Sequence, residues 1–130
     1  MRRPSPKELC QKVANALAAL RANRYAFATM RHWAGDSDEL GLQSSNQLWP
    51  LLIVLLEEIR VAGPEKTYAG TFPPMRGYQE ERAIKDEELW PFTWQSTRMG
   101  KQMYLKFVLT KNRSGDWHFF HLDCHESASQ

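Results

Sequence analysis

Apolar and polar side chains alternate along the segment Gln102-Met103-Tyr104-Leu105-Lys106-Phe107-Val108-Leu109-Thr110. A period of two residues is typical of a β-strand with one face buried in a core. One face would carry Met103, Leu105, Phe107 and Leu109, and the other Tyr104, Lys106, Val108 and Thr110. The first face predicts a core, and the second presents groups capable of chemistry.

Two neighbouring segments predict partner strands for residues 102–110. Residues 93–98 and 117–125 are rich in aromatic or β-branched side chains. Turn residues that include Gly100 and Gly115 separate them from the central segment. Three strands joined by short turns predict an antiparallel meander.

Two long helices are expected ahead of these strands. Ser5 and Glu8 have capping-box spacing, with a proline between them, and predict a helix over residues 6–22. Residues 47–60 are apolar almost all round, which predicts a buried helix. Pro50 would fall in its first turn, where the missing N–H costs little.

Three other segments are less regular. Residues 36–42 predict a short capped turn of helix that ends at Gly41. Residues 25–33 fit either a short helix or an extended piece. Residues 67–78 contain several Gly and Pro, and an irregular stretch of this length is usually functional or mobile.

This order of elements predicts an α+β fold, with N-terminal helices packed on one face of a small C-terminal antiparallel sheet. The 130 residues suit a single domain over residues 1–130. The terminal residues 1–5 and 126–130 are expected to be disordered tails.

Composition narrows the class of protein. A hydrophobic content of 42% and a charged content of 25% are ordinary for a globular protein. The longest apolar run, residues 48–56, is far shorter than the ~20 residues of a membrane span, and the basic N-terminus lacks the apolar core of a secretory signal. We therefore expect a cytoplasmic protein without a membrane partner. Cys10 and Cys124 predict free thiols, with Cys10 in the core.

Charge is segregated along the chain. Residues 1–31 are basic with Glu8 as their sole acid, residues 35–65 are mainly acidic, and residues 92–113 contain Lys and Arg but no acid. Such segregation favours an anionic partner. The alternative is that these charges only keep exposed faces hydrated.

The second basic segment carries groups suited to RNA. Arg98, Lys101 and Lys106 offer cations to phosphate, and Trp94 and Tyr104 offer rings for stacking on bases. An edge strand with hydrated lysines explains the same residues without a ligand.

The last predicted strand contains titratable groups. Alternation places Phe120, Leu122 and Cys124 on the core face, and His121, Asp123 and His125 on the face of Tyr104. Metal-free RNA cleavage needs a base, an acid and a phosphate contact, which His, Tyr and Lys supply. A zinc site is disfavoured because the histidines and Cys124 divide between two faces, so neither a metal nor another cofactor is expected.

Several motifs, taken in order, resemble the MqsR family of bacterial toxin ribonucleases. They are Asp38-Glu39-Leu40-Gly41-Leu42, the apolar segment 48–59, Glu65-Lys66-Thr67-Tyr68, Trp94-Gln95, Met103-Tyr104-Leu105-Lys106 and Cys124-His125-Glu126. The resemblance covers residues 28–126. The chain differs from the family in the inserted residues 71–88, a shorter gap between Gln95 and Tyr104, and an additional basic N-terminal helix.

The resemblance implies a RelE-like fold and an mRNA endoribonuclease of a type II toxin–antitoxin system. It places Lys66, Gln95, Tyr104 and His125 on functional positions, with His125 in place of a lysine. Arg76 or Lys85, on the inserted segment, are alternatives to Lys66 as the phosphate contact. It further implies a metal-independent reaction, with or without the ribosome, and a cognate antitoxin as partner.

Two readings from other classes compete with a ribonuclease. A non-catalytic RNA- or DNA-binding regulatory module would use the same basic and aromatic residues. A protein-interaction subunit is the third reading, although an inhibitor of this type more often has an acidic or disordered half.

Overall fold

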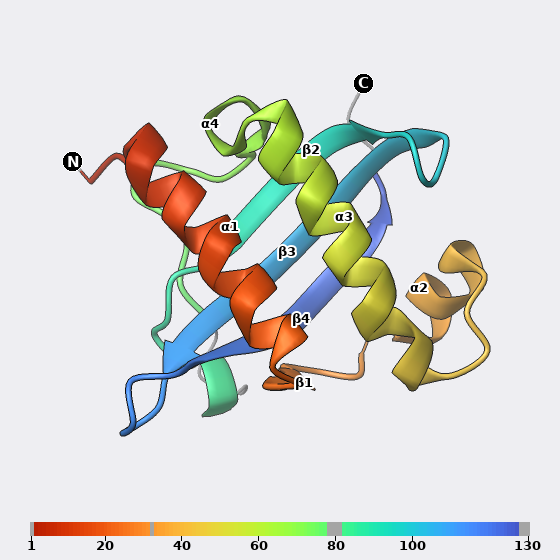
Figure 1. Ribbon diagram of the computed structural model, residues 1–130, viewed down its shortest axis with the longest axis horizontal. Helices are drawn as coiled ribbons and strands as arrows, with labels where there is room; N and C mark the ends of the chain where they lie inside the picture. Colours follow the sequence, from red (N-terminus) through yellow and green to blue (C-terminus); the bar gives the residue numbers. More distant parts are fainter. Residues whose placement is uncertain (1, 32, 78–81, 128–130) are drawn as a thin grey trace.

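A computed structural model describes residues 2–31, 33–77 and 82–127. The chain folds as α+β, with helices on one side of a four-stranded sheet of order β1-β4-β3-β2. Figure 1 shows α1 and α3 lying across this side, which we call the helix face. The helices are α1 (Pro6–Arg21), α2 (Trp33–Leu40), α3 (Leu48–Ala62) and α4 (Pro64–Thr67). The strands are β1 (Tyr25–Phe27), β2 (Trp90–Ser96), β3 (Lys101–Lys111) and β4 (Trp117–Glu126).

Helix α1 begins where its capping signal predicts. The Ser5 hydroxyl accepts a hydrogen bond from the Glu8 N–H at 3.0 Å, and Pro6 opens the first turn. The second half of the expected box is replaced, because the Glu8 carboxylate pairs with Arg2 instead. Cys10, expected in the core, is exposed on this helix.

Helix α3 follows a single 3-10 turn, Ser45–Gln47, and supplies the centre of the core. Its buried residues are Leu48, Trp49, Leu51, Leu52, Leu55, Leu56 and Ile59. They pack in one cluster with Met103, Leu105 and Phe107 of β3. The expectation of a buried helix is confirmed for these residues, whereas Val54 is exposed on its outer side.

The undecided segment after α1 forms strand β1. It pairs in parallel with β4, with Tyr25 opposite Phe119 and Phe27 opposite His121. The sheet is therefore mixed, rather than the purely antiparallel sheet that the sequence predicted. Aromatic contacts hold β1 in place, since Tyr25 stacks on Trp49 with ring centroids 4.3 Å apart.

A β-bulge changes which residues of β4 face the helices. Lys106 pairs with Asp123 but Phe107 pairs with His121, so Leu122 has no opposite residue. His121 is consequently turned to the helix face, and the prediction that it shares a face with Tyr104 is wrong. Phe120 and Leu122 were predicted in the main core, but they pack in a second cluster with Ile84, Leu89 and Val108.

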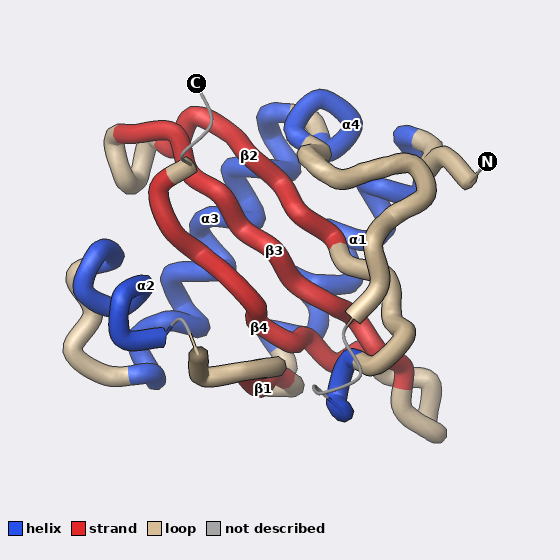
Figure 2. Tube along the Cα trace, turned by 180° about the vertical axis from the view of Figure 1, so that it is seen from behind, coloured by secondary structure: helices blue, strands red, loops and turns tan. Residues whose placement is uncertain are grey.

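The face of β2, β3 and β4 opposite the helices carries Tyr104, Lys106 and His125, and we call it the open face. Figure 2 shows this side, where the chain between α4 and β2 runs past the strands. The 3-10 helix Arg82–Ile84 belongs to that segment. A Cβ on Gly77 would lie 2.0 Å from the Ile84 carbonyl oxygen, so the close approach of this segment to itself requires glycine.

Both ends of the described chain make defined contacts, although tails were expected there. Arg2 forms an ion pair with Glu88 at 2.6 Å, and Arg3 lies over the ring of Phe72 at 4.5 Å. At the other end, the Ser127 N–H donates to the Gln102 carbonyl at 2.9 Å. Met1 and residues 128–130 lie outside the described residues. Within the described ranges, no helix combines the length and apolar character required to span a membrane.

Candidate functional site on the open face of the sheet

Tyr104 and His125 form a pair on the open face. They are directly opposite each other in the β3–β4 register, and their rings stack with centroids 5.3 Å apart and an angle of 25° between planes. The prediction that these two side chains lie on one face is confirmed. Neighbouring strands thus hold a phenol and an imidazole against each other.

The hydrogen bond of His125 determines its tautomer. Its Nδ1 lies 2.8 Å from the Glu126 carbonyl oxygen. A carbonyl can only accept, so Nδ1 must carry the proton of this bond. In the neutral ring, Nε2 therefore keeps a lone pair with which it can take a proton.

Tyr104 is partly buried. Burial raises the pKa of its phenol, the nearby Lys106 opposes that shift, and Asp123 adds to it. A raised pKa keeps the phenol protonated at neutral pH. Tyr104 is therefore arranged to donate a proton, whereas His125 can accept one.

Lys106 lies two residues from Tyr104 on the same face and is paired with a carboxylate. Its Nζ is 3.2 Å from an oxygen of Asp123. The two residues are also opposite each other in the strand register. This ion pair partly cancels the positive charge that Lys106 would offer to a phosphate.

A small hollow of about 160 Å³ adjoins this group. The chain after α4 forms one wall, and the sheet supplies Pro91, Tyr104 and Lys106. Gly70, Thr71 and Met75 belong to the first wall. Sequence reasoning missed these three residues, although the length of the irregular segment was a signal that it has a function.

Polar side chains extend the group toward the edge of the sheet. Thr93 is opposite Tyr104, and Gln95 is opposite Gln102. Alternation puts Thr93 and Gln95 on the open face. The predicted site residue Gln95 thus lies diagonally across from Tyr104.

Arg76 follows Met75 of the hollow in the chain but does not itself line the hollow. It is exposed, and its guanidinium donates to the Asp86 carbonyl at 2.6 Å. As an alternative to Lys66 for the phosphate contact, Arg76 therefore lies on the segment that walls the hollow.

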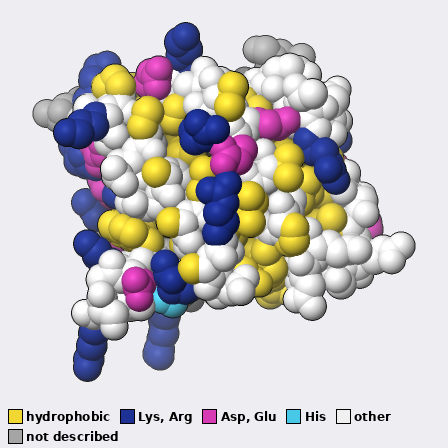
Figure 3. Space-filling view, in the orientation of Figure 1, with side chains coloured by type: hydrophobic (Ala, Val, Ile, Leu, Met, Phe, Trp, Pro, Cys, Tyr) yellow, Lys and Arg dark blue, Asp and Glu magenta, His cyan; other side chains and the backbone are white. Residues whose placement is uncertain are grey.

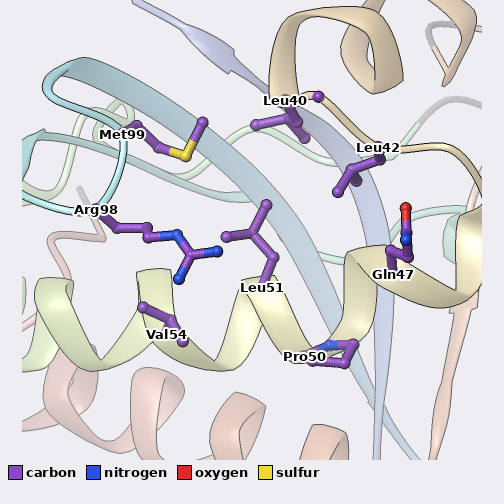
Figure 4. A pocket seen from close by; sticks show the side chains of 9 residues that line it. Leu40, Leu42, Gln47, Pro50, Leu51, Val54, Arg98 and Met99 are labelled. Carbon is purple, nitrogen blue, oxygen red and sulfur yellow. The ribbon is translucent and has the colours of Figure 1, made fainter.

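Four other predicted site residues are turned away from Tyr104. Trp94 is only 3% exposed and donates from Nε1 to Glu58 at 2.9 Å, so it cannot stack on a base. His121 is 1% exposed on the helix face. Lys101 lies 3.9 Å from both Glu39 and Glu126. Arg98 lies beside α3 on the helix face, as Figure 4 shows.

Lys66 also lies apart from the pair. It belongs to α4, a short helix that contacts α1, α3 and β2.

The expectation that Arg98, Lys101 and Lys106 share one surface is wrong, because only Lys106 is on the open face. The fold separates residues that are close in sequence on the β2–β3 turn.

Glu58 of α3 is a polar anchor that sequence reasoning did not identify. Its carboxylate accepts from Trp94 Nε1, from the Ser96 hydroxyl at 2.7 Å and from the Arg98 N–H at 2.8 Å. Burial raises the pKa of Glu58, but these hydrogen bonds outweigh it and leave the pKa below its ordinary value. Glu58 thus fixes the start of the β2–β3 turn against α3.

Within the described residues, His, Cys, Asp and Glu side chains form no group of three or more that could hold a metal ion. Comparisons with protein-family models, curated proteins and solved structures found no match for this chain. The functional argument therefore rests on the residues of the open face.

Proposed function

We propose that this protein is a metal-independent endoribonuclease that uses the open face of its sheet. The observation that carries this proposal is the stacked pair of Tyr104 and His125, in which one group holds a proton and the other can accept one. These are the two proton-transfer roles that cleavage of RNA by its own 2′-hydroxyl requires.

The reaction follows from these roles. Nε2 of His125 takes the proton of the ribose 2′-hydroxyl, and the 2′-oxygen forms a bond to phosphorus. The bond from phosphorus to the 5′-oxygen breaks, and the phenol of Tyr104 gives its proton to that oxygen. The products are a 2′,3′-cyclic phosphate and a 5′-hydroxyl.

Lys106 is the cation best placed to balance charge on the phosphate. Its pairing with Asp123 at 3.2 Å means that RNA competes with the carboxylate for the ammonium group. Arg76 can supply a second contact from the segment that walls the hollow. Gln95 is proposed to orient the substrate from the neighbouring strand, and Lys66 has no proposed role because it lies in α4.

We further propose that the arrangement of helices and strands is RelE-like and that the protein is a toxin of a type II toxin–antitoxin system. Support comes from the resemblance of its motifs to the MqsR family, in which Gln95, Tyr104 and His125 fall on functional positions. On this proposal the substrate is mRNA in the cytoplasm, and a cognate antitoxin inhibits the enzyme.

Turnover of a defined RNA in EDTA by two single variants tests this function. Tyr104→Phe and His125→Ala should each lower turnover by about 10²–10⁴-fold, the range for a general acid or base. His118→Ala and Tyr25→Phe are matched controls, since His118 bonds to Asn112 and Tyr25 stacks on Trp49. If the wild type and all four variants bind RNA without cleaving it, the protein is a binding module instead.

A further inference from the structure

The outer side of α3 carries two adjoining hollows that the proposed function does not use. One, of about 520 Å³, lies between α3, the end of α2 and the β2–β3 turn. The other, of about 590 Å³, lies between α3 and the edge of β2. Val54 lines both, so the two hollows adjoin along α3, and together we call them the α3 groove.

The α3 groove has apolar walls that are open to solvent. Val54 is 40% exposed and Val61 is 77% exposed. Leu51 and Met99 line the first hollow, and Ala62 lines the second. Figure 3 shows hydrophobic side chains at the surface along α3. Adjacent exposed apolar side chains of this kind are typical of surfaces that bind a partner.

One wall of the groove is a free strand edge. Strand β2 is the last strand of the sheet, and the Pro91 carbonyl accepts from the Ala69 N–H on its outer side. Backbone groups two residues apart point the same way along a strand, so the N–H and C=O of Gln95 also point outward. Within the described residues, no strand pairs with Gln95 on that side. These groups can hydrogen-bond to an added strand.

Arg98 supplies a cation in the first hollow, beside Val54. Figure 4 shows its guanidinium pointing into the first hollow, between Val54 and Leu51. Among the described residues, this guanidinium has no hydrogen-bond acceptor. The carboxylate of Glu58 accepts from the Arg98 main-chain N–H instead. Glu57 is also engaged, with Arg21 and Arg60 at 2.5 Å each. A carboxylate from outside the chain is therefore the natural partner of Arg98.

We propose that the α3 groove binds an extended segment of another protein, which adds to the edge of β2 and places a carboxylate on Arg98. The residue paired with Gln95 would form two main-chain hydrogen bonds, with its side chain on the open face. Its neighbours, opposite Trp94 and Ser96, would point to the helix face, and an apolar side chain opposite Trp94 would fill the hollow beside Val61. Side chains recur on one side of a strand about every 7 Å. An Asp or Glu two positions along, opposite Ser96, then lies on the same face next to Arg98.

This site is separate from the Tyr104–His125 pair, because the groove is on the helix face and the pair is on the open face. Gln95 is shared, since its main chain borders the groove and its side chain is proposed to orient RNA. A nucleic acid is a poor occupant, because Glu57 and Glu58 line the groove beside the apolar residues. The combination of a free backbone edge, apolar walls and one cation favours an apolar peptide with one carboxylate placed to reach Arg98.

A selection from displayed random eight-residue peptides on the wild-type protein tests this inference. Enriched peptides should carry an apolar residue two positions from Asp or Glu. A selected peptide should bind at least tenfold more weakly to Val61→Asp and to Arg98→Glu, and unchanged to Arg113→Glu, a charge reversal in the exposed β3–β4 turn. Melting temperatures show whether each variant folds.

Two further measurements on the selected peptide test strand addition itself. N-methylation of the peptide amide paired with Gln95 should abolish binding, whereas methylation of its neighbours should be tolerated. Binding should also slow hydrogen exchange of the Gln95 amide. Failure to enrich any peptide, or binding that survives both Val61→Asp and Arg98→Glu, would overturn the proposal, and neither result depends on ribonuclease activity.

Discussion

His121 is buried without a hydrogen bond to either ring nitrogen among the described residues. Its ring contacts the edge of Phe27 with centroids 5.3 Å apart. Burial is the main cause that lowers its pKa to about 4, with Asp123 opposing the shift and His125 adding to it. The neutral ring therefore behaves as an aromatic core residue, and its protonation opposes folding.

We predict that His121 makes the fold sensitive to mild acid. Well above pH 6.5 the ring is neutral in both states, and the residue adds no pH dependence to the free energy of unfolding. As the pH falls from 6.5 to about 4, only the unfolded state gains the proton, so stability decreases. The loss should approach about 3 kcal/mol. Denaturant unfolding of His121→Phe should show a flatter pH profile in this window, and an unchanged profile would contradict the account.

At the scale of the elements, α3 has a core side and a groove side with different energetic roles. Leu55 is fully buried, whereas Val61 is exposed. Leu55→Ala should lower the free energy of unfolding by about 2–5 kcal/mol, because it removes packed methyl groups and leaves a cavity. Val61→Ala should change it by less than about 0.5 kcal/mol. Equal losses in urea unfolding would show that α3 is not packed as described.

The elements also show what the sequence can predict. The start of α1 was predictable because Ser5 and Glu8 carry the signal within four residues. The bulge at Leu122 was not, because it arises from the pairing of two whole strands. His125 lies after the bulge and was assigned to the correct face, whereas His121 lies before it and was assigned to the wrong one.

At the scale of the whole molecule, Arg98 and Lys101 lie on the helix face and Lys106 lies on the open face, although the sequence predicted one shared basic surface. Tyr104 and His125 could be predicted on one face because each follows the alternation of its own strand, whereas their direct pairing depends on the β3–β4 register. The positions of Arg98 and Lys101 depend on how the β2–β3 turn packs on α3 and α2, through Glu58 and Glu39. No local pattern in the sequence encodes those contacts.

This separation predicts how RNA binding responds to salt. Each phosphate contact contributes about 0.7 to the slope of log affinity against log salt for single strands. Lys106→Ala should reduce the slope by about that amount, because Lys106 is on the open face. Lys101→Ala should leave it unchanged, since Lys101 lies between Glu39 and Glu126. Fluorescence anisotropy with labelled RNA measures both slopes. If Lys101→Ala reduced the slope and Lys106→Ala did not, RNA would bind on the helix face instead.

The end groups of the cleaved RNA test the central claim most directly. The wild-type protein, incubated in EDTA with an RNA of defined sequence, should leave a 2′,3′-cyclic phosphate and a 5′-hydroxyl, as read by mass spectrometry. A single 2′-deoxy nucleotide at the cleavage position should abolish the cut there, because the attacking oxygen is missing. A 5′-phosphate product, or cleavage that persists at the 2′-deoxy position, would contradict the roles assigned to Tyr104 and His125.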